Sequence, residues 1–290
     1  MFDIKKIYEP NTLNEALDIY HNNPQLKIIA GGTDVLIQLR NGDYEELELL
    51  SINKLSELKN IKLLNDGTIV IGALCTFSQL FRNDIINEYL PILAIASVSM
   101  GGPQIRNVAT VGGNICNGAV SADSAPALFT LNAKLKLQSK NNVRMIPITE
   151  FYLGPGKVKL ETGEILTEIH ITKDEYENKK GKYIKFSNRK AMDIAMVSVA
   201  VLLETENNVF KDLRIALGVS APTPIRCLNA EQYAKGKEIN NDTIKAISEL
   251  TLNDAKPRNS WRGSKAYREH LIKTLTERAI LEVIGGKIDE

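Results

Sequence analysis

The stretch TVGGNICNGAVSAD, residues 110–123, places very little side-chain volume in the middle of a 290-residue chain. It contains a glycine pair, small residues and a closing acid, with no lysine or arginine. A second glycine pair stands in AGGTDVL, residues 30–36. Glycine lets backbone amides approach a ligand without a Cβ in the way, and several inward-facing amides favour anionic oxygens. We interpret the two turns as sharing one pyrophosphate through their amides, with a positive φ at Gly113; the alternative is that each pair only closes a tight turn.

Two familiar phosphate-binding motifs are absent from these turns. Neither contains GxGxxG, which argues against a Rossmann dinucleotide site, and neither contains GxxxxGK[ST], which argues against an ATP-hydrolysing loop. The acid Asp123 at the end of the second stretch does not suit a phosphate, but a carboxylate accepts hydrogen bonds from hydroxyls well. It could also cap the helix expected in SAPALFTL, residues 124–131.

The composition is that of an ordinary globular protein, with 43% hydrophobic and 24% charged residues. A length of 290 residues favours two or three domains. The net charge of +1 gives no electrostatic reason to expect nucleic acid or an anionic membrane as a partner. Neither a secretory signal nor an apolar run of membrane-spanning length is present, so we expect a cytoplasmic protein with no membrane contact.

The cysteines and histidines form no metal-binding pattern. Cys75, Cys116 and Cys227 are widely separated, without CxxC spacing, and the three histidines form no HExxH motif. We therefore expect no metal site on this chain and no nucleophilic catalytic residue. Cys75 and Cys227 are expected to pack in the core, whereas Cys116, within the glycine stretch, could form a wall beside a ligand.

Periodicity and capping signals divide the chain into three parts. Residues 1–60 carry a helix capped by Thr12, a short strand before the first glycine turn, and a helix or strand over 35–42. Residues 61–174 mix strands with apolar helices, including one that begins after Thr76. The charged stretch KDEYENKKGK, residues 173–182, leads into 175–290, where three antiparallel strands precede helices. We predict an α+β fold with domains 1–60, 61–174 and 175–290.

Four segments together resemble one known family. KIIAGGTDVL, GGPQIRNVATVGGNICNGAVSADSAPAL, KFSNRKAMDIAMVSVA and GVSAPTPIR occur in this order. They resemble the FAD-binding medium subunit of molybdenum-containing hydroxylases, which include xanthine, nicotinate and aerobic carbon monoxide dehydrogenases. The resemblance implies a two-subdomain FAD-binding fold of the vanillyl-alcohol-oxidase type. A C-terminal domain with a three-stranded antiparallel sheet and helices would follow it.

The resemblance also implies which residues hold FAD. Lys185 would lie near the isoalloxazine, stabilise the negative charge of reduced flavin and raise its potential. Leu166 would pack on the ring, Gly101 beside Met100 would lie on its other side, and Arg106 could pair with Asp123 or with backbone. The implied cofactor-binding residues are Ile29, Ala30, Gly31, Gly32, Thr33, Asp34, Val35, Leu36, Gly101, Thr110, Gly113, Asn114, Asn117, Asp123, Leu166 and Lys185.

The function implied by the resemblance is electron transfer within a heterotrimer. Molybdopterin would reside on a large partner subunit and 2Fe–2S clusters on a small one, and FAD on this chain would pass electrons to NAD(P) or another acceptor. No cysteine cluster for an additional 4Fe–4S centre is present. Two alternatives stay open: a stand-alone FAD-dependent oxidase or dehydrogenase of a small alcohol or amine, and a non-catalytic nucleotide-binding scaffold.

Overall fold

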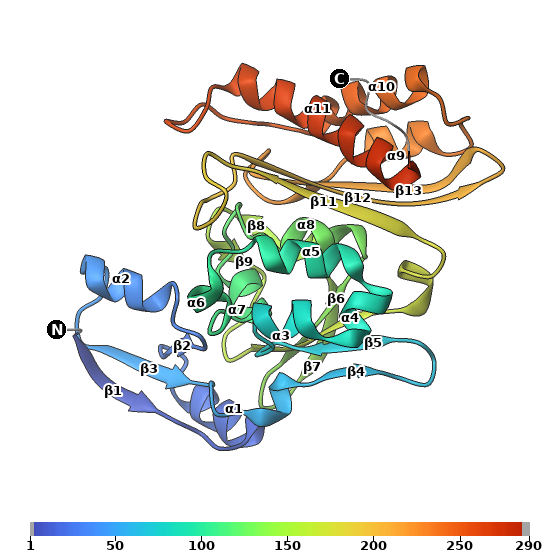
Figure 1. Ribbon diagram of the computed structural model, residues 1–290. Helices are drawn as coiled ribbons and strands as arrows, with labels where there is room; N and C mark the ends of the chain where they lie inside the picture. The colour runs from blue at the N-terminus through green and yellow to red at the C-terminus, as the bar shows by residue number, and fades with distance from the viewer. Residues whose placement is uncertain (1–2, 286–290) are drawn as a thin grey trace.

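The computed structural model describes residues 3–285 and contains both helices and strands. Figure 1 shows the central sheet, the helices above it, the C-terminal sheet and its covering helices as successive layers. The N-terminal unit, drawn in blue, lies to one side of the central sheet. This arrangement leaves the N-terminal unit and the central helices facing each other, which is where both glycine turns lie.

The N-terminal unit is a parallel three-stranded sheet, in the order β1-β3-β2, with two helices. Its first helix is capped as predicted, because the Thr12 Oγ1 accepts the Glu15 amide at 3.2 Å. The segment after the first glycine turn is a helix that ends at Gly42 with φ 79°. The elements are β1 Ile4–Tyr8, α1 Leu13–Asn22, β2 Lys27–Ile29, α2 Val35–Asn41 and β3 Leu47–Ser51.

The central unit is an antiparallel five-stranded sheet, in the order β4-β5-β10-β6-β7, covered by short helices. The helix predicted after Thr76 begins there with a capping box to Gln79. Its strands are β4 Ile61–Leu63, β5 Ile69–Gly72, β6 Lys134–Gln138, β7 Val143–Pro147 and β10 Ile165–Ile171, with a small hairpin of β8 Tyr152–Gly154 and β9 Lys157–Val158. Its helices are α3 Phe77–Arg82, α4 Asp84–Tyr89, α5 Pro91–Ser99, α6 Pro103–Arg106, α7 Val111–Cys116 and α8 Ala125–Thr130.

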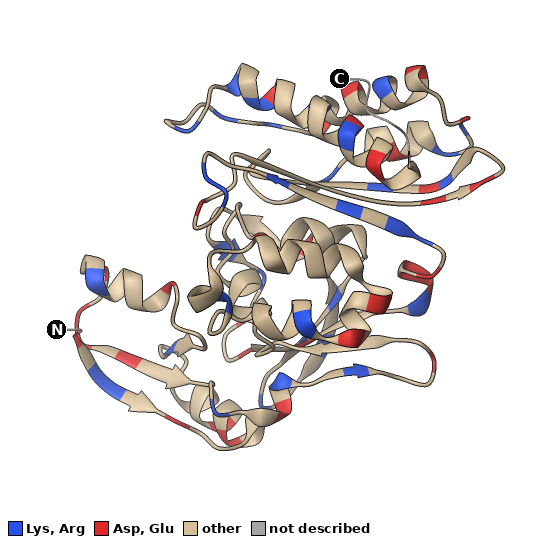
Figure 2. Cartoon of the chain, viewed as in Figure 1, with Lys and Arg blue, Asp and Glu red and all other residues tan. Residues whose placement is uncertain are grey.

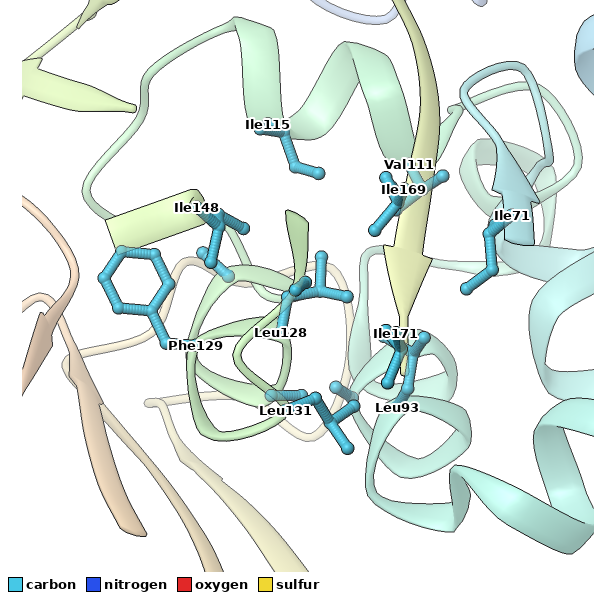
Figure 3. Close-up of a cluster of buried hydrophobic side chains, with 14 of the residues drawn as sticks. Ile71, Leu93, Val111, Ile115, Leu128, Phe129, Leu131, Ile148, Ile169 and Ile171 are labelled. Atoms are coloured by element: carbon cyan, nitrogen blue, oxygen red, sulfur yellow. The ribbon is translucent and has the colours of Figure 1, made fainter. Parts of the chain in front are cut away.

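The second glycine turn is held by the core of this unit. Figure 3 shows Val111 and Ile115 of α7 pointing into the same cluster as Ile71 and Ile169 of the sheet. All four side chains are fully buried. The backbone between Val111 and Ile115 is therefore fixed against the sheet by apolar burial on both sides of the glycines.

The C-terminal unit is an antiparallel sheet covered on both faces. Alternate residues of β12 face opposite layers. Ala200 and Leu202 pack with α5 and α8, whereas Val199 and Val201 pack on the α9–α11 side. This alternation is what a strand with two covered faces requires. The predicted three strands are joined by a two-residue fourth, β14, which pairs with β13. The elements are β11 Lys180–Phe186, β12 Val197–Glu206, β13 Val209–Gly218, β14 Ile225–Arg226, α9 Leu228–Ala234, α10 Asn241–Leu250 and α11 Lys265–Ile284.

Candidate cofactor-binding site

The two glycine turns line one cavity of about 700 Å³ between the N-terminal and central units. The first turn touches the segment just before the second, because a Cβ built on Gly31 would lie 1.9 Å from the carbonyl oxygen of Val108. Only glycine permits so close an approach between the first turn and the segment that leads into α7. Turns about 80 residues apart in the sequence are therefore brought together, as predicted.

The first turn presents unengaged backbone amides to the cavity. Among the hydrogen bonds of residues 3–285, none uses the amides of residues 31–35 as donors. All five of these residues line the cavity, and Gly32 adopts a positive φ of 75°. Consecutive amides in such a turn form a concave group of donors that suits an anionic oxygen. The first turn thus has the donor arrangement that a pyrophosphate needs.

The second turn differs from the prediction, because its amides already donate to protein acceptors. The Gly113 amide donates to Thr110 Oγ1 at 3.1 Å, and the Asn114 amide donates to the Thr110 carbonyl at 3.0 Å. The amides of Val111 and Gly112 donate to carbonyls at the end of β5, at 2.9 and 2.8 Å. Burial of the flanking apolar residues draws this segment into a capped helix, so its amides have protein acceptors in this structure, and their share in holding a pyrophosphate stays a prediction.

The glycine pair of the second turn has a packing role instead. The predicted positive φ at Gly113 is wrong, because Gly113 lies within helix α7 and is not among the residues with left-handed backbone. A Cβ on Gly112 would lie 2.7 Å from both the carbonyl oxygen and the Cβ of Ala73. The small volume of this stretch therefore lets α7 lie directly on the sheet and keeps the cavity open.

Polar side chains give the cavity a second kind of contact. Burial raises the pKa of the Asp34 carboxyl, and a hydrogen bond with the Asn117 side chain opposes that rise. Asn114 Oδ1 accepts the Ser124 hydroxyl at 2.7 Å, which fixes the orientation of the Asn114 amide group. Burial also raises the pKa of the Cys116 thiol to about 12, so this wall residue is a neutral thiol.

Most of the predicted residues meet in this cavity, and some do not. The predicted residues that line it are Ala30, Gly31, Gly32, Thr33, Asp34, Val35, Thr110, Gly113, Asn114, Asn117 and Leu166. The predicted residues that lie outside its lining are Ile29, Leu36, Gly101, Asp123 and Lys185. Met100, predicted beside Gly101, does line the cavity.

Asp123 and Lys185 form a buried ion pair beside the cavity. Lys185 Nζ donates to Asp123 Oδ2 at 2.9 Å and to the Ser99 carbonyl at 3.2 Å, and both charged side chains are 9% exposed. The Tyr183 hydroxyl donates to the other Asp123 oxygen at 3.3 Å. Burial raises the pKa of Asp123, while Lys185 opposes the rise. Lys185 also lines a smaller cavity of about 300 Å³ with residues 186–191 and Asp193.

Two interpretations left open by the sequence are now decided. Asp123 does not cap helix α8, whose N-cap is Ser124 without a side-chain hydrogen bond. Arg106 bonds to backbone, with Nη1 donating to the Met100 carbonyl at 2.9 Å. This bond anchors the chain beside the cavity wall, because Met100 lines the cavity.

The sequence did not predict three residues of the N-terminal unit that also line the cavity. Lys27 and Tyr44 line the cavity, and Lys27 Nζ donates to the Tyr44 hydroxyl at 3.1 Å. Tyr20 of α1 lines it as well. They lie on different elements, so no local sequence pattern marks them. Their contribution is a mixed aromatic and cationic part of the cavity wall.

Within residues 3–285, no group of three or more histidine, cysteine, aspartate or glutamate side chains is placed to hold a metal ion. Over the same range, no helix combines the length and the apolar character that a membrane crossing requires.

Comparison with known families matches nearly the whole chain. The model described as "FAD binding domain in molybdopterin dehydrogenase" matches residues 2–173, and the model described as "CO dehydrogenase flavoprotein C-terminal domain" matches residues 182–283. The chain therefore belongs to the FAD-binding flavoprotein subunits of the molybdopterin dehydrogenase family. It is an oxidoreductase subunit whose cofactor is FAD.

Particular relatives agree over their full length. The chain is 46% identical to the xanthine dehydrogenase FAD-binding subunit of Escherichia coli O157:H7, over 99% of this chain and 100% of that subunit. It is 31% identical to the glyceraldehyde dehydrogenase medium chain of Sulfolobus acidocaldarius, over 94% of this chain and 95% of that one. A chain of carbon monoxide dehydrogenase from Hydrogenophaga pseudoflava superposes with a TM-score of 0.93 at 26% identity, covering 98% of this chain and 99% of that chain. The predicted family and α+β fold class are confirmed.

The residues present fit FAD. Free amides at residues 31–35 suit its pyrophosphate, and the Asp34 and Asn117 side chains offer partners for hydroxyl groups. Leu166 and Met100 supply apolar wall for a flat ring system. A volume of about 700 Å³ lies within the range of known cofactor sites.

Proposed function

We propose that this chain is the FAD-carrying electron-transfer subunit of a multi-subunit molybdenum hydroxylase. In this proposal it takes electrons from 2Fe–2S clusters of a small partner subunit and delivers them to NAD(P) or another acceptor. Molybdopterin would be held by a large partner subunit. The observation that carries the proposal is a cavity lined by both free amides and apolar side chains, on a chain that matches FAD-binding subunits along its length.

The residues of the chain bind and orient the cofactor in this proposal. When bound, FAD supplies the electron-transfer chemistry, so no protein nucleophile is needed. The amides of residues 31–35 would hold the pyrophosphate, and Asn114 and Asn117 would contact the cofactor with their side chains. Leu166 and Met100 would pack against the ring and exclude water from it.

The role predicted for Lys185, to stabilise the negative charge of reduced flavin, remains a proposal, and its ion pair limits how much charge it can offer. Its ammonium is paired with Asp123 at 2.9 Å, so much of its charge is compensated inside the protein. The pair joins β11 to the segment before helix α8, and the bond from Lys185 to the Ser99 carbonyl holds the end of α5. Lys185 would therefore affect the cofactor partly by fixing the wall at Met100, which follows Ser99.

The proposal includes a large molybdopterin subunit, a small iron–sulfur subunit and an electron acceptor as partners, and a cytoplasmic location. Relatives with matching length are named as FAD-binding subunits or medium chains, which supports large and small partner subunits and a heterotrimer. We also propose the domain limits 1–60, 61–174 and 175–290. Three free cysteines support a reducing, cytoplasmic location.

Purification of the tagged chain from its native host tests the proposal. We expect a yellow complex with equimolar FAD, a molybdenum-containing chain and an iron–sulfur chain, and loss of hydroxylation when this subunit is isolated. A yellow chain without partners that oxidises an alcohol or amine would instead identify a stand-alone oxidase. A complex in which this chain carries no flavin would support a scaffold.

A further inference from the structure

One segment of the C-terminal unit carries a strong local excess of positive charge. Residues 256–268, KPRNSWRGSKAYR, contain five basic residues and no acid, in a chain whose net charge is only +1. Arg258 is exposed, and Trp261 is 81% exposed, the largest exposed fraction among the exposed large apolar residues. The Arg262 guanidinium stacks 4.2 Å from the centre of the Trp261 ring. Exposed tryptophan beside arginine is the composition typical of the centres of protein interfaces.

The arginines of this segment lack carboxylate partners. Arg268 is 3% exposed and donates only to neutral acceptors, the Met196 and Val219 carbonyls and the Ser260 hydroxyl. Within residues 3–285, Arg258, Arg262 and Arg268 form no ion pair, and the Nε atoms of Arg262 and Arg268 are buried without an acceptor. The positive charge of this segment is thus not neutralised by carboxylates within residues 3–285, so its surface favours an acidic partner over a basic one.

A second loop extends the same surface. Residues 187–194 carry the exposed cations Arg189 and Lys190 and the exposed apolar side chains Met192 and Ile194. Their one acid, Asp193, is already engaged by Arg189 at 3.5 Å. In Figure 1 both loops lie at the same end of the C-terminal sheet, and Figure 2 shows Lys and Arg colouring on both.

Packing at the base of the two loops makes them one surface. A Cβ on Gly263 would lie 2.9 Å from the sulfur of Met196. Met196 stands two residues after the end of loop 187–194. Arg268 donates to the Met196 carbonyl. The two loops are therefore fixed to each other at their base.

This surface adjoins the wall of the candidate FAD cavity. The Met192 amide donates to the Gly101 carbonyl at 3.3 Å, and Gly101 directly follows Met100, which lines the cavity. The smaller cavity lined by residues 185–191 and Asp193 lies between the surface and Lys185. An electron donor seated on the two loops would thus stand next to the cavity wall at Met100.

We propose that the iron–sulfur partner subunit docks on this surface through a cluster of carboxylates placed around an apolar side chain. The docking face consists of Arg189, Lys190, Met192, Arg258, Trp261 and Arg262. Its charge steers an acidic partner toward the cavity, and burial of Trp261 and Met192 holds the partner there. The inference rests on the proposed function, because that function supplies the iron–sulfur subunit.

Binding between this chain and the purified iron–sulfur subunit tests the docking face. The variants are Lys190→Glu/Arg258→Glu and Trp261→Ala; all three side chains are exposed, and neither cation forms an ion pair within residues 3–285. The control Lys235→Glu/Lys237→Glu makes the same change in net charge beyond helix α9. We expect each docking-face variant to weaken binding at least about tenfold, with FAD content unchanged, and the control to leave it within about twofold. The charge variant should also lose most of the salt dependence between about 0.01 and 0.15 M ionic strength.

Each other outcome contradicts the docking face. Wild-type affinity for the iron–sulfur subunit in both variants would overturn the docking face. Equal weakening of binding by the control variant would also overturn it, because that result indicates a general effect of net charge. Intact binding with slower reduction of the external acceptor would assign the face to that acceptor. A wild-type chain that binds no iron–sulfur subunit at all refutes the proposed function and is recognised before any variant is made.

Discussion

Replacement of Gly31 by alanine should separate the two walls of the cavity. The added Cβ would lie 1.9 Å from the Val108 carbonyl oxygen, where ordinary contact begins at 3.4 Å, so the first turn and the Val108 backbone must part by 3.4 − 1.9 = 1.5 Å. Overpacking of this kind costs about 1–3 kcal/mol. FAD needs the closed arrangement, and each 1.4 kcal/mol is a factor of ten in affinity, so the Kd for FAD should rise about fivefold to a hundredfold.

Titration of apoprotein with FAD, followed by flavin fluorescence, measures this change. Gly154→Ala is the matched control, because a Cβ at Gly154 meets nothing within 4 Å and its φ is not positive. The control should bind FAD as wild type does. If Gly31→Ala binds FAD as tightly as Gly154→Ala, then the contact between the two turns does not set the shape of the site.

Three further predictions follow from the same contacts. Thr110→Val removes the acceptor of the Gly113 amide and should lower the free energy of unfolding by about 1 kcal/mol in urea denaturation; no loss would contradict the cap. Lys185→Met leaves Asp123 buried without its cation and should cost about 3–5 kcal/mol at pH 7. Since burial raises the pKa of Asp123 above 3.8 and Lys185 opposes this, the variant's Asp123 binds a proton more readily when folded, and its deficit should shrink as pH falls; a deficit independent of pH would refute the charge argument. Cys116, with a pKa of about 12, should resist iodoacetamide at pH 8 in the folded protein, and rapid alkylation detected by mass spectrometry would show an accessible thiolate.

Local signals in the sequence predicted the elements well. Thr12 and Thr76 cap their helices because the acceptor and the amide it serves are three residues apart. The strand before the first glycine turn and the alternating strand ending at Ile171 also follow from short-range patterns. Segment 35–42 stayed undecided between helix and strand, since its apolar run fits either.

Long-range contacts decided what the sequence could not. The amides of Val111 and Gly112 are engaged by the Cys75 and Ala73 carbonyls just after β5, which no pattern within residues 110–114 reveals. Asp123 and Lys185 are 62 residues apart and meet only because β11 packs beside helix α5. The first turn kept its amides free because β2 ends before Gly31, and that depends on the pairing of β2 with β3.

Amide hydrogen exchange measured with and without FAD tests the central claim most directly. The amides of residues 31–35 have no acceptor within residues 3–285, so they should exchange rapidly in apoprotein and slow at least about tenfold when FAD binds. The amides of residues 111–114 already donate to protein, so they should be protected in both states. Protection gained at 111–114 while 31–35 continue to exchange rapidly would contradict the assignment of the pyrophosphate to the first turn.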